Sequence, residues 1–83
     1  MRVSKNADRQ RLATIDRLIA SLEGERRRQG LSLNEVATRA GLSRTMIMRV
    51  EKRARTPSID TLLRIAEALD CDLGALIERA SKA

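Results

Sequence analysis

The stretch from Ser43 to Glu51, SRTMIMRVE, carries an unusual set of side chains for a short helix. Ile47 and Val50 are three residues apart, so on a helix they share one face, which we expect to be buried. The opposite face then combines guanidinium donors with methyl groups: Arg44, Thr45, Met48 and Arg49. A surface that meets only water is more easily made from Glu and Lys. This composition indicates a binding surface, and the rest of the chain must show for what.

Other residue types exclude several kinds of chemistry. With no His and a single Cys, the chain has too few ligands for a structural zinc site, and catalytic groups that depend on His are missing. A lone Cys forms no internal disulfide, which fits a reducing compartment. Aromatic residues, on which single-stranded nucleic acids stack their bases, are absent. No apolar run is long enough to span a membrane, and residues 1–30 have no signal-peptide core. We therefore expect a non-enzymatic, cytoplasmic protein without cofactor or metal.

The positive charge of the chain is concentrated in its middle third. The whole sequence of 83 residues has a net charge of +6. The segment from Arg26 to Arg55 contains nine basic and two acidic residues, a net charge of +7, whereas the remainder carries −1. Such a basic segment suggests a polyanionic partner. The alternative is that these residues only keep the surface soluble.

Apolar spacing predicts five helices and an all-α fold with an aliphatic core. The first helix is expected over roughly residues 6–28, ending before Gly30, and two short helices follow on either side of a tight turn at Gly41. A fourth helix follows Pro57, and a fifth follows the turn at residues 70–72. Helices this short are marginal alone and need a shared core. The expected core positions are Leu12, Ile15, Leu18, Ile19, Leu22, Val36, Ala37, Ala40, Ile47, Val50, Ile59, Leu62, Leu63, Ile65, Ala66, Leu69, Leu73, Leu76 and Ile77.

Capping residues mark where these helices begin. Ser32, followed three residues later by Glu35, has the pattern of a capping box. Ser43, Ser58 and Asp72 stand in the corresponding position before the third, fourth and fifth helices. The chain is thus expected to form one compact domain over residues 1–83.

The segment from Leu31 to Ile77, LSLNEVATRAGLSRTMIMRVEKRARTPSIDTLLRIAEALDCDLGALI, resembles the helix-turn-helix domain of lambda/434-type repressors and the wider Xre family. The markers of this resemblance are spread along the segment at family spacing: Leu31-Ser32, Val36-Ala37, Gly41, Ser43, Ile47, Glu51, Pro57-Ser58, Leu62, Ala66 and Leu69. The resemblance implies a lambda repressor-like bundle with a central helix-turn-helix. It covers residues 18–79 and leaves residues 1–17 as an N-terminal extension.

The resemblance implies that the third helix lies in the DNA major groove. Arg44, Thr45 and Arg49 then match positions where family members read bases. Arginine can grip guanine O6 and N7, and the methyl groups of Thr and Met can meet those of thymine. Phosphate contacts are expected at both helix starts and after the third helix, which gives the full set Ser32, Leu33, Ser43, Arg44, Thr45, Met48, Arg49, Lys52, Arg53 and Arg55. Leu33 replaces a Gln that is frequent in the family and cannot donate a side-chain hydrogen bond.

Other residues match structural positions of the family or depart from them. Arg26 and Glu51 fall where the family forms a partly buried ion pair. Arg53 replaces a common Gly, so it must adopt a left-handed conformation or the turn must differ. Met46 is expected to be packing rather than a reader, and Cys71 to be a core residue rather than a redox switch.

The sequence leads us to expect a DNA-binding transcriptional regulator, in particular a repressor that occupies its operator as a homodimer on double-stranded DNA. Candidate dimer surfaces are the fifth helix, near Gly74 and Ala75, and the Leu12/Ile15 face of the first. Two alternatives share the fold: an antitoxin-type regulator, whose toxin could contact residues 1–16, and a protein-interaction module. The substitutions at Leu33 and Met48 keep the second alternative open, whereas the basic segment opposes it.

Overall fold

Five helices make up the protein in the computed structural model, which describes residues 5–82. They are α1 (Lys5–Arg28), α2 (Leu33–Ala40), α3 (Arg44–Glu51), α4 (Ile59–Ala68) and α5 (Leu73–Lys82). The part described contains no strand. The all-α, five-helix prediction is therefore confirmed.

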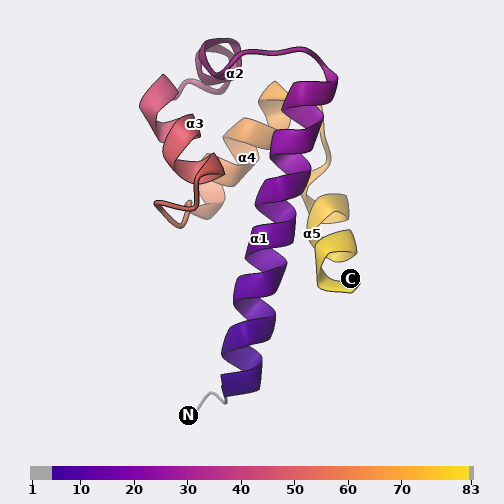
Figure 1. The fold of residues 1–83 in the computed structure, drawn as a ribbon. Helices are drawn as coiled ribbons and strands as arrows, with labels where there is room; N and C mark the ends of the chain where they lie inside the picture. The colour runs from indigo at the N-terminus through magenta and orange to yellow at the C-terminus, as the bar shows by residue number, and fades with distance from the viewer. Residues whose placement is uncertain (1–4, 83) are drawn as a thin grey trace.

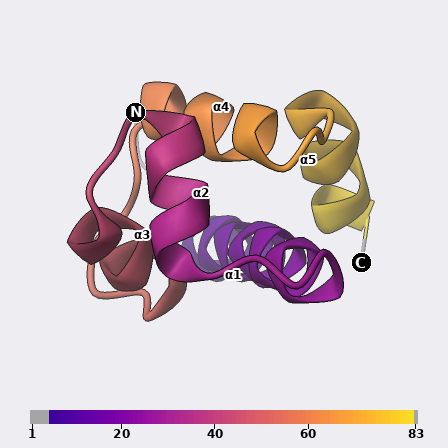
Figure 2. The same cartoon turned by 90° about the horizontal axis from the view of Figure 1, so that it is seen from above.

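The helices pack on both sides of the C-terminal half of α1. α2 packs against α3 and α4, while α1 contacts both α3 and α5. Two perpendicular views place α3 and α5 on opposite sides of the molecule (Figures 1 and 2). The faces of α3 and α5 that point away from α1 are thus well separated.

The core is aliphatic and receives residues from every helix. α1 contributes Leu18, Ile19 and Leu22, and every one of these is at most 5% exposed. The other buried apolar residues are Val36, Ala37, Ala40, Ile47, Val50, Ile65, Ala66, Leu69, Leu73, Leu76 and Ala80. Helices of eight to ten residues such as α2 to α5 depend on this shared burial for their stability.

Three of the expected core positions are wrong: Leu12 on α1, which is described below, and Ile59 and Leu63 on α4. Ile59 is 62% exposed and Leu63 is 43% exposed. These two residues lie one turn apart on α4, at the edge of its apolar stripe, so the rotation of the helix that buries Ile65 and Ala66 turns them to the surface. The spacing of apolar residues in the sequence therefore predicted a wider buried face than α4 has.

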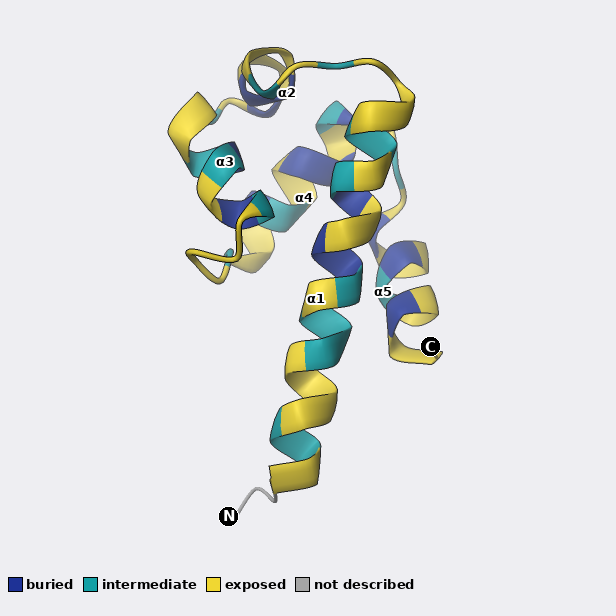
Figure 3. Cartoon of the chain, viewed as in Figure 1, coloured by how far each residue is buried: buried dark blue, intermediate teal, exposed yellow. Residues whose placement is uncertain are grey.

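The N-terminal half of α1 extends beyond the core. Burial declines toward the N-terminus of the helix (Figure 3): Ile19 is buried, Ile15 packs partly against the core, and Leu12 is 62% exposed. Ile15 therefore covers the core of its own domain, whereas Leu12 does not.

The predicted caps are present. Ser32 accepts a hydrogen bond from the Glu35 amide at 3.0 Å, and its own amide donates to the Glu35 carboxylate at 3.0 Å, which completes the capping box. Ser58 accepts from the Thr61 amide, and Asp72 accepts from the Ala75 amide. Each cap satisfies a backbone donor that the first turn of a helix leaves unpaired.

The turn between α2 and α3 depends on Gly41. This residue has φ +69°, a left-handed conformation that favours glycine, and a Cβ there would lie 3.1 Å from the Arg64 guanidinium. The turn sets α3 across α2 and so fixes which side of α3 faces outward.

Candidate nucleic-acid interface

α3 presents one apolar and one polar face, as the sequence predicted. Ser43 caps the helix by accepting from the Met46 amide at 3.0 Å. Ile47 and Val50 are 1% and 2% exposed, so their side of the helix is entirely in the core. Met46 is partly buried against the same core, which confirms its packing role.

The outward face of α3 consists of the residues predicted for it. Arg44, Thr45 and Arg49 are exposed, and Met48 is half-buried. Three of the four side chains are therefore fully accessible to a partner, and Met48 is partly accessible.

Most basic residues on and directly after α3 differ in their surroundings from the three arginines at the end of α1. In the α1 segment Arg26, Arg27 and Arg28 all form salt bridges with glutamates. By contrast, four of the five basic residues on and directly after α3 are exposed and have no salt bridge or side-chain hydrogen bond within residues 5–82: Arg44, Arg49, Lys52 and Arg55. Lys5, Arg9, Arg39 and Arg79 share this property, but they are spread over α1, α2 and α5, whereas these four lie within twelve residues of the chain. Positive charge is therefore uncompensated on this surface, which favours an anionic partner.

The carboxylate of Glu51, at the end of α3, is withdrawn from this surface. Glu51 accepts two hydrogen bonds from Arg26, at 2.7 and 2.9 Å, and the two side chains are only 14% and 12% exposed. Arg26 also donates to the Leu31 carbonyl at 2.9 Å. Hydrogen bonding to Glu51 raises the pKa of Arg26 above its ordinary value. The predicted ion pair is present, and it joins α1 to the end of α3.

The start of α2 offers backbone donors rather than side chains. The Leu33 side chain packs partly against the core, and the Ser32 hydroxyl is engaged in its cap. The amides of Leu33 and Asn34 make no hydrogen bond within the described chain, as is usual for a first helical turn. Such free amides at a helix N-terminus suit a phosphate oxygen.

Arg53 has the left-handed conformation expected of a residue in place of Gly. Its φ is +58°, and its amide donates to the Val50 carbonyl at 3.1 Å. Its guanidinium, however, turns toward α1: Nε lies 2.8 Å from an Asp16 carboxylate oxygen. The phosphate role expected of Arg53 would require it to leave this partner. Asp16 was not among the expected site residues.

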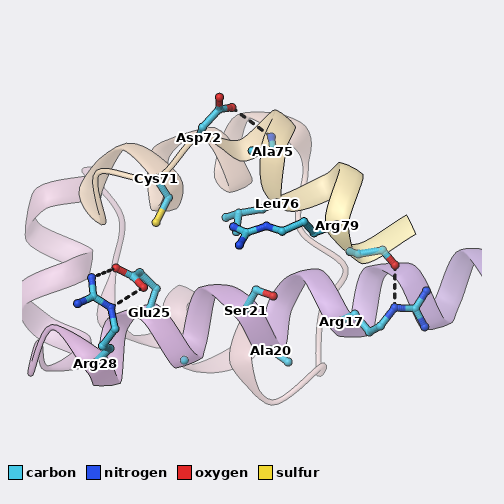
Figure 4. A pocket seen from close by; sticks show the side chains of 12 residues that line it. Arg17, Ala20, Ser21, Glu25, Arg28, Cys71, Asp72, Ala75, Leu76 and Arg79 are labelled. Carbon is cyan, nitrogen blue, oxygen red and sulfur yellow. Dashed lines mark hydrogen bonds and ion pairs between the residues drawn. The ribbon is translucent and has the colours of Figure 1, made fainter. Parts of the chain in front are cut away.

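A hollow lies between α1 and α5, away from α3. It has a volume of about 670 Å³ and is lined partly by small residues, Ala20, Gly24 and Ala75 among them. Figure 4 shows the Cys71 thiol and the Arg79 side chain over this groove, with Arg17 donating to the Ala80 carbonyl at its end, at 2.7 Å. Cys71 is partly rather than fully buried, and burial raises the pKa of its thiol.

No group of three His, Cys, Asp or Glu side chains within residues 5–82 is arranged to hold a metal ion. Nor does any helix of that part have an apolar stretch sufficient to cross a membrane.

Two short helices joined at a left-handed glycine, the second with an outward basic face, define a helix-turn-helix protein. The comparison with protein families gives the same result, since the HTH_3 family model, described as helix-turn-helix, matches residues 22–76. The chain therefore belongs to this lambda repressor/Xre-like helix-turn-helix family, whose fold is all-α and whose domain is that of DNA-binding transcription regulators. Neither the comparison with curated proteins nor that with solved structures gives a match.

Proposed function

We propose that this protein is a sequence-specific regulator that binds double-stranded DNA and represses transcription by occupying its operator. The observation that supports this most strongly is the uncompensated positive charge of Arg44, Arg49, Lys52 and Arg55 beside a carboxylate, Glu51, that is held by Arg26. A surface that served only solubility would gain from the salt bridges that the α1 arginines make. On a surface that binds phosphates, such salt bridges would weaken binding, because each one would have to be broken before its cation could contact a phosphate.

In this proposal α3 enters the major groove. Arg44 and Arg49 read bases through their guanidinium groups, and Thr45 and Met48 supply methyl contacts. The amides at the start of α2, the Ser32 and Ser43 hydroxyl groups, Lys52 and Arg55 hold phosphates on either side of the groove. Lys52 and Arg55 stand at the C-terminal end of α3, where a residue reaches the backbone rather than the base edges.

A homodimer is the proposed working unit. Each well-read base pair contributes about 1–3 kcal/mol of discrimination, and regulators require roughly 4–10 kcal/mol over random DNA. A single α3 falls short of the upper part of that range, whereas two helices on half-sites about one helical turn apart reach it. The candidate contact surfaces are α5, beside the groove with Ala20, Gly24 and Ala75, and the exposed Leu12 face of α1.

Selection of bound duplexes from a random DNA pool tests the proposal. A palindromic motif with half-sites about one helical turn apart is the expected result. Sedimentation of the protein with the selected duplex should then give two chains per site. Enrichment of a single half-site that is bound by one chain would contradict the homodimer. No enrichment, with salt-sensitive binding also absent, would favour the interaction module, and capture of a toxin through residues 1–16 would favour the antitoxin.

A further inference from the structure

We propose that Asp16 is a positioning residue for DNA binding, because it holds Arg53 and thereby fixes the segment that carries Arg55. This inference rests on the proposed function. Asp16 lies outside the family match at residues 22–76, on the part of α1 where the helix leaves the core. The proposal therefore gives a residue of the N-terminal extension a role at the DNA-facing surface.

Arg53 bridges two elements that the chain separates widely. Its guanidinium donates to the Asp16 carboxylate through Nε at 2.8 Å and to the Asp16 carbonyl through a terminal nitrogen at 3.2 Å, over a sequence separation of 37 residues. It also donates to the Glu51 carbonyl and lies 3.9 Å from the Glu23 carboxylate. One guanidinium thus ties the end of α3 to α1 by both charge and hydrogen bonds.

The segment after Arg53 has little else to hold it. The Ala54 amide donates to the Arg49 carbonyl at 2.9 Å and closes the end of α3. Residues 55–57 then make no backbone hydrogen bond within the described chain. Between this segment and α1 lies a cleft of about 480 Å³, bordered by Leu12, Ile15 and Arg55. The position of Arg55 relative to α3 therefore depends on the anchor at Arg53.

The backbone of Arg53 supports the same assignment. A left-handed φ of +58° is strained for any residue with a Cβ and persists only where the surroundings impose it. Gly would remove the strain, but it would also remove the side chain that links this turn to Asp16. Contacts of the guanidinium with α1 offset the strain, which gives a physical reason for an arginine at a position that suits glycine.

The alternative is that Arg53 is itself a phosphate ligand that pairs with Asp16 only in the absence of DNA. It predicts the opposite change in DNA affinity when the Asp16 charge is removed. Removal of the Asp16 charge would then free Arg53 and strengthen DNA binding. Under the positioning role, the same substitution weakens binding because Arg55 loses its fixed place.

The experiment compares three variants. Asp16→Asn breaks the contact with little change in size, and Arg53→Gly removes the guanidinium at a φ that glycine accepts. Asp8→Asn is the matched control, since Asp8 lies on the same helix and its partner within residues 5–82 is the exposed Arg11. Affinities for the selected duplex are measured at one salt concentration. Asp16→Asn and Arg53→Gly should each weaken binding several-fold, by no more than Arg55→Ala does, whereas Asp8→Asn should leave it unchanged or slightly stronger.

Combination with Arg55→Ala shows whether the effect passes through Arg55. Asp16→Asn should weaken the wild type but have no further effect in the Arg55→Ala background. Stronger binding by Asp16→Asn than by Asp8→Asn, or full additivity with Arg55→Ala, would overturn the proposal.

A measurement without DNA separates this inference from the proposed function. NMR order parameters of the Arg53 Nε–H group and of the amides of residues 54–56 should fall in Asp16→Asn and stay unchanged in Asp8→Asn. If the wild type selects no duplex, the regulator proposal fails, while these order parameters still test the anchor. Unchanged order parameters in Asp16→Asn would overturn the anchor whatever the DNA result.

Discussion

Arg26 and Glu51 face each other through two parallel hydrogen bonds of 2.7 and 2.9 Å, across a sequence separation of 25 residues. The pair joins the C-terminal half of α1 to the last residue of α3. Since its desolvation offsets much of its attraction, we regard it as a determinant of the orientation of α3 more than of net stability.

Arg26→Met should therefore destabilise the fold by about 3 kcal/mol, because it leaves the Glu51 carboxylate largely buried without a partner. The double variant Arg26→Met/Glu51→Leu should recover most of this loss, since no buried charge remains. Urea denaturation of both variants measures the difference. A double variant as unstable as Arg26→Met would show that packing at Arg26, rather than charge, is responsible.

Arg49→Ala should cost about 1–3 kcal/mol of binding to the selected duplex and relax the preference at one base pair. The reason is the position of Arg49 on the outward face of α3, exposed and without an internal partner. Repeating the selection with the variant tests the prediction. Equal weakening on specific and random DNA would contradict a base-reading role.

Arg55→Ala should weaken binding to all sequences alike. A phosphate contact releases about one counterion, so the slope of log K against log salt concentration should become shallower by roughly one. Titrations at several salt concentrations measure the slope. A change of base preference instead would place Arg55 in the groove.

Cys71 should react slowly with a thiol reagent in the native protein. Burial raises the pKa of its thiol, so less thiolate is available at pH 8, and the side chain packs partly against the core. Labelling kinetics with and without denaturant give the comparison. Equal rates in the two conditions would reverse the prediction and make the thiol freely accessible.

Glu35→Gln should lower stability at neutral pH but not in acid. Hydrogen bonds from the amide and hydroxyl of Ser32 lower the pKa of Glu35 from 4.5. A carboxylate whose pKa is lowered by folding contributes stability above its unfolded pKa and loses it as pH falls through the folded value. The melting temperatures of wild type and variant should thus converge below pH 4.5, as followed by circular dichroism. A gap that stays constant from pH 7 to pH 2.5 would exclude this linkage.

The sequence was most informative where structure is local. Capping boxes and left-handed glycines involve residues within a few positions of one another, so Ser32, Ser43 and Gly41 could be assigned from pattern alone. The outward face of α3 followed from the spacing of Ile47 and Val50. The Arg26–Glu51 pair is long-range, and only family resemblance predicted it.

The predictions that were wrong or missing concern features that depend on tertiary packing. The apolar spacing of α4 includes Ile59 and Leu63, but which part of a broad stripe is buried depends on the helices that pack against it. The contact between Asp16 and Arg53 had no local signal, because an Asp on a helix and an Arg in a turn are ordinary in isolation. Gly at this position is common in the family, and only the φ of +58° together with the guanidinium contacts shows why Arg is accommodated.

The burial gradient along α1 has a consequence for how the domain opens. All fully buried residues of this 24-residue helix lie between Leu18 and Leu22, so its first turns are stabilised by little beyond the helix itself. Amide protection should rise along α1, from values close to those of an isolated peptide near Lys5 to the global unfolding free energy near Ile19. The amide of Asp16 should have a protection between these two values. The anchor for Arg53 is thus built on a segment that can fray and re-form while the rest of the domain stays folded.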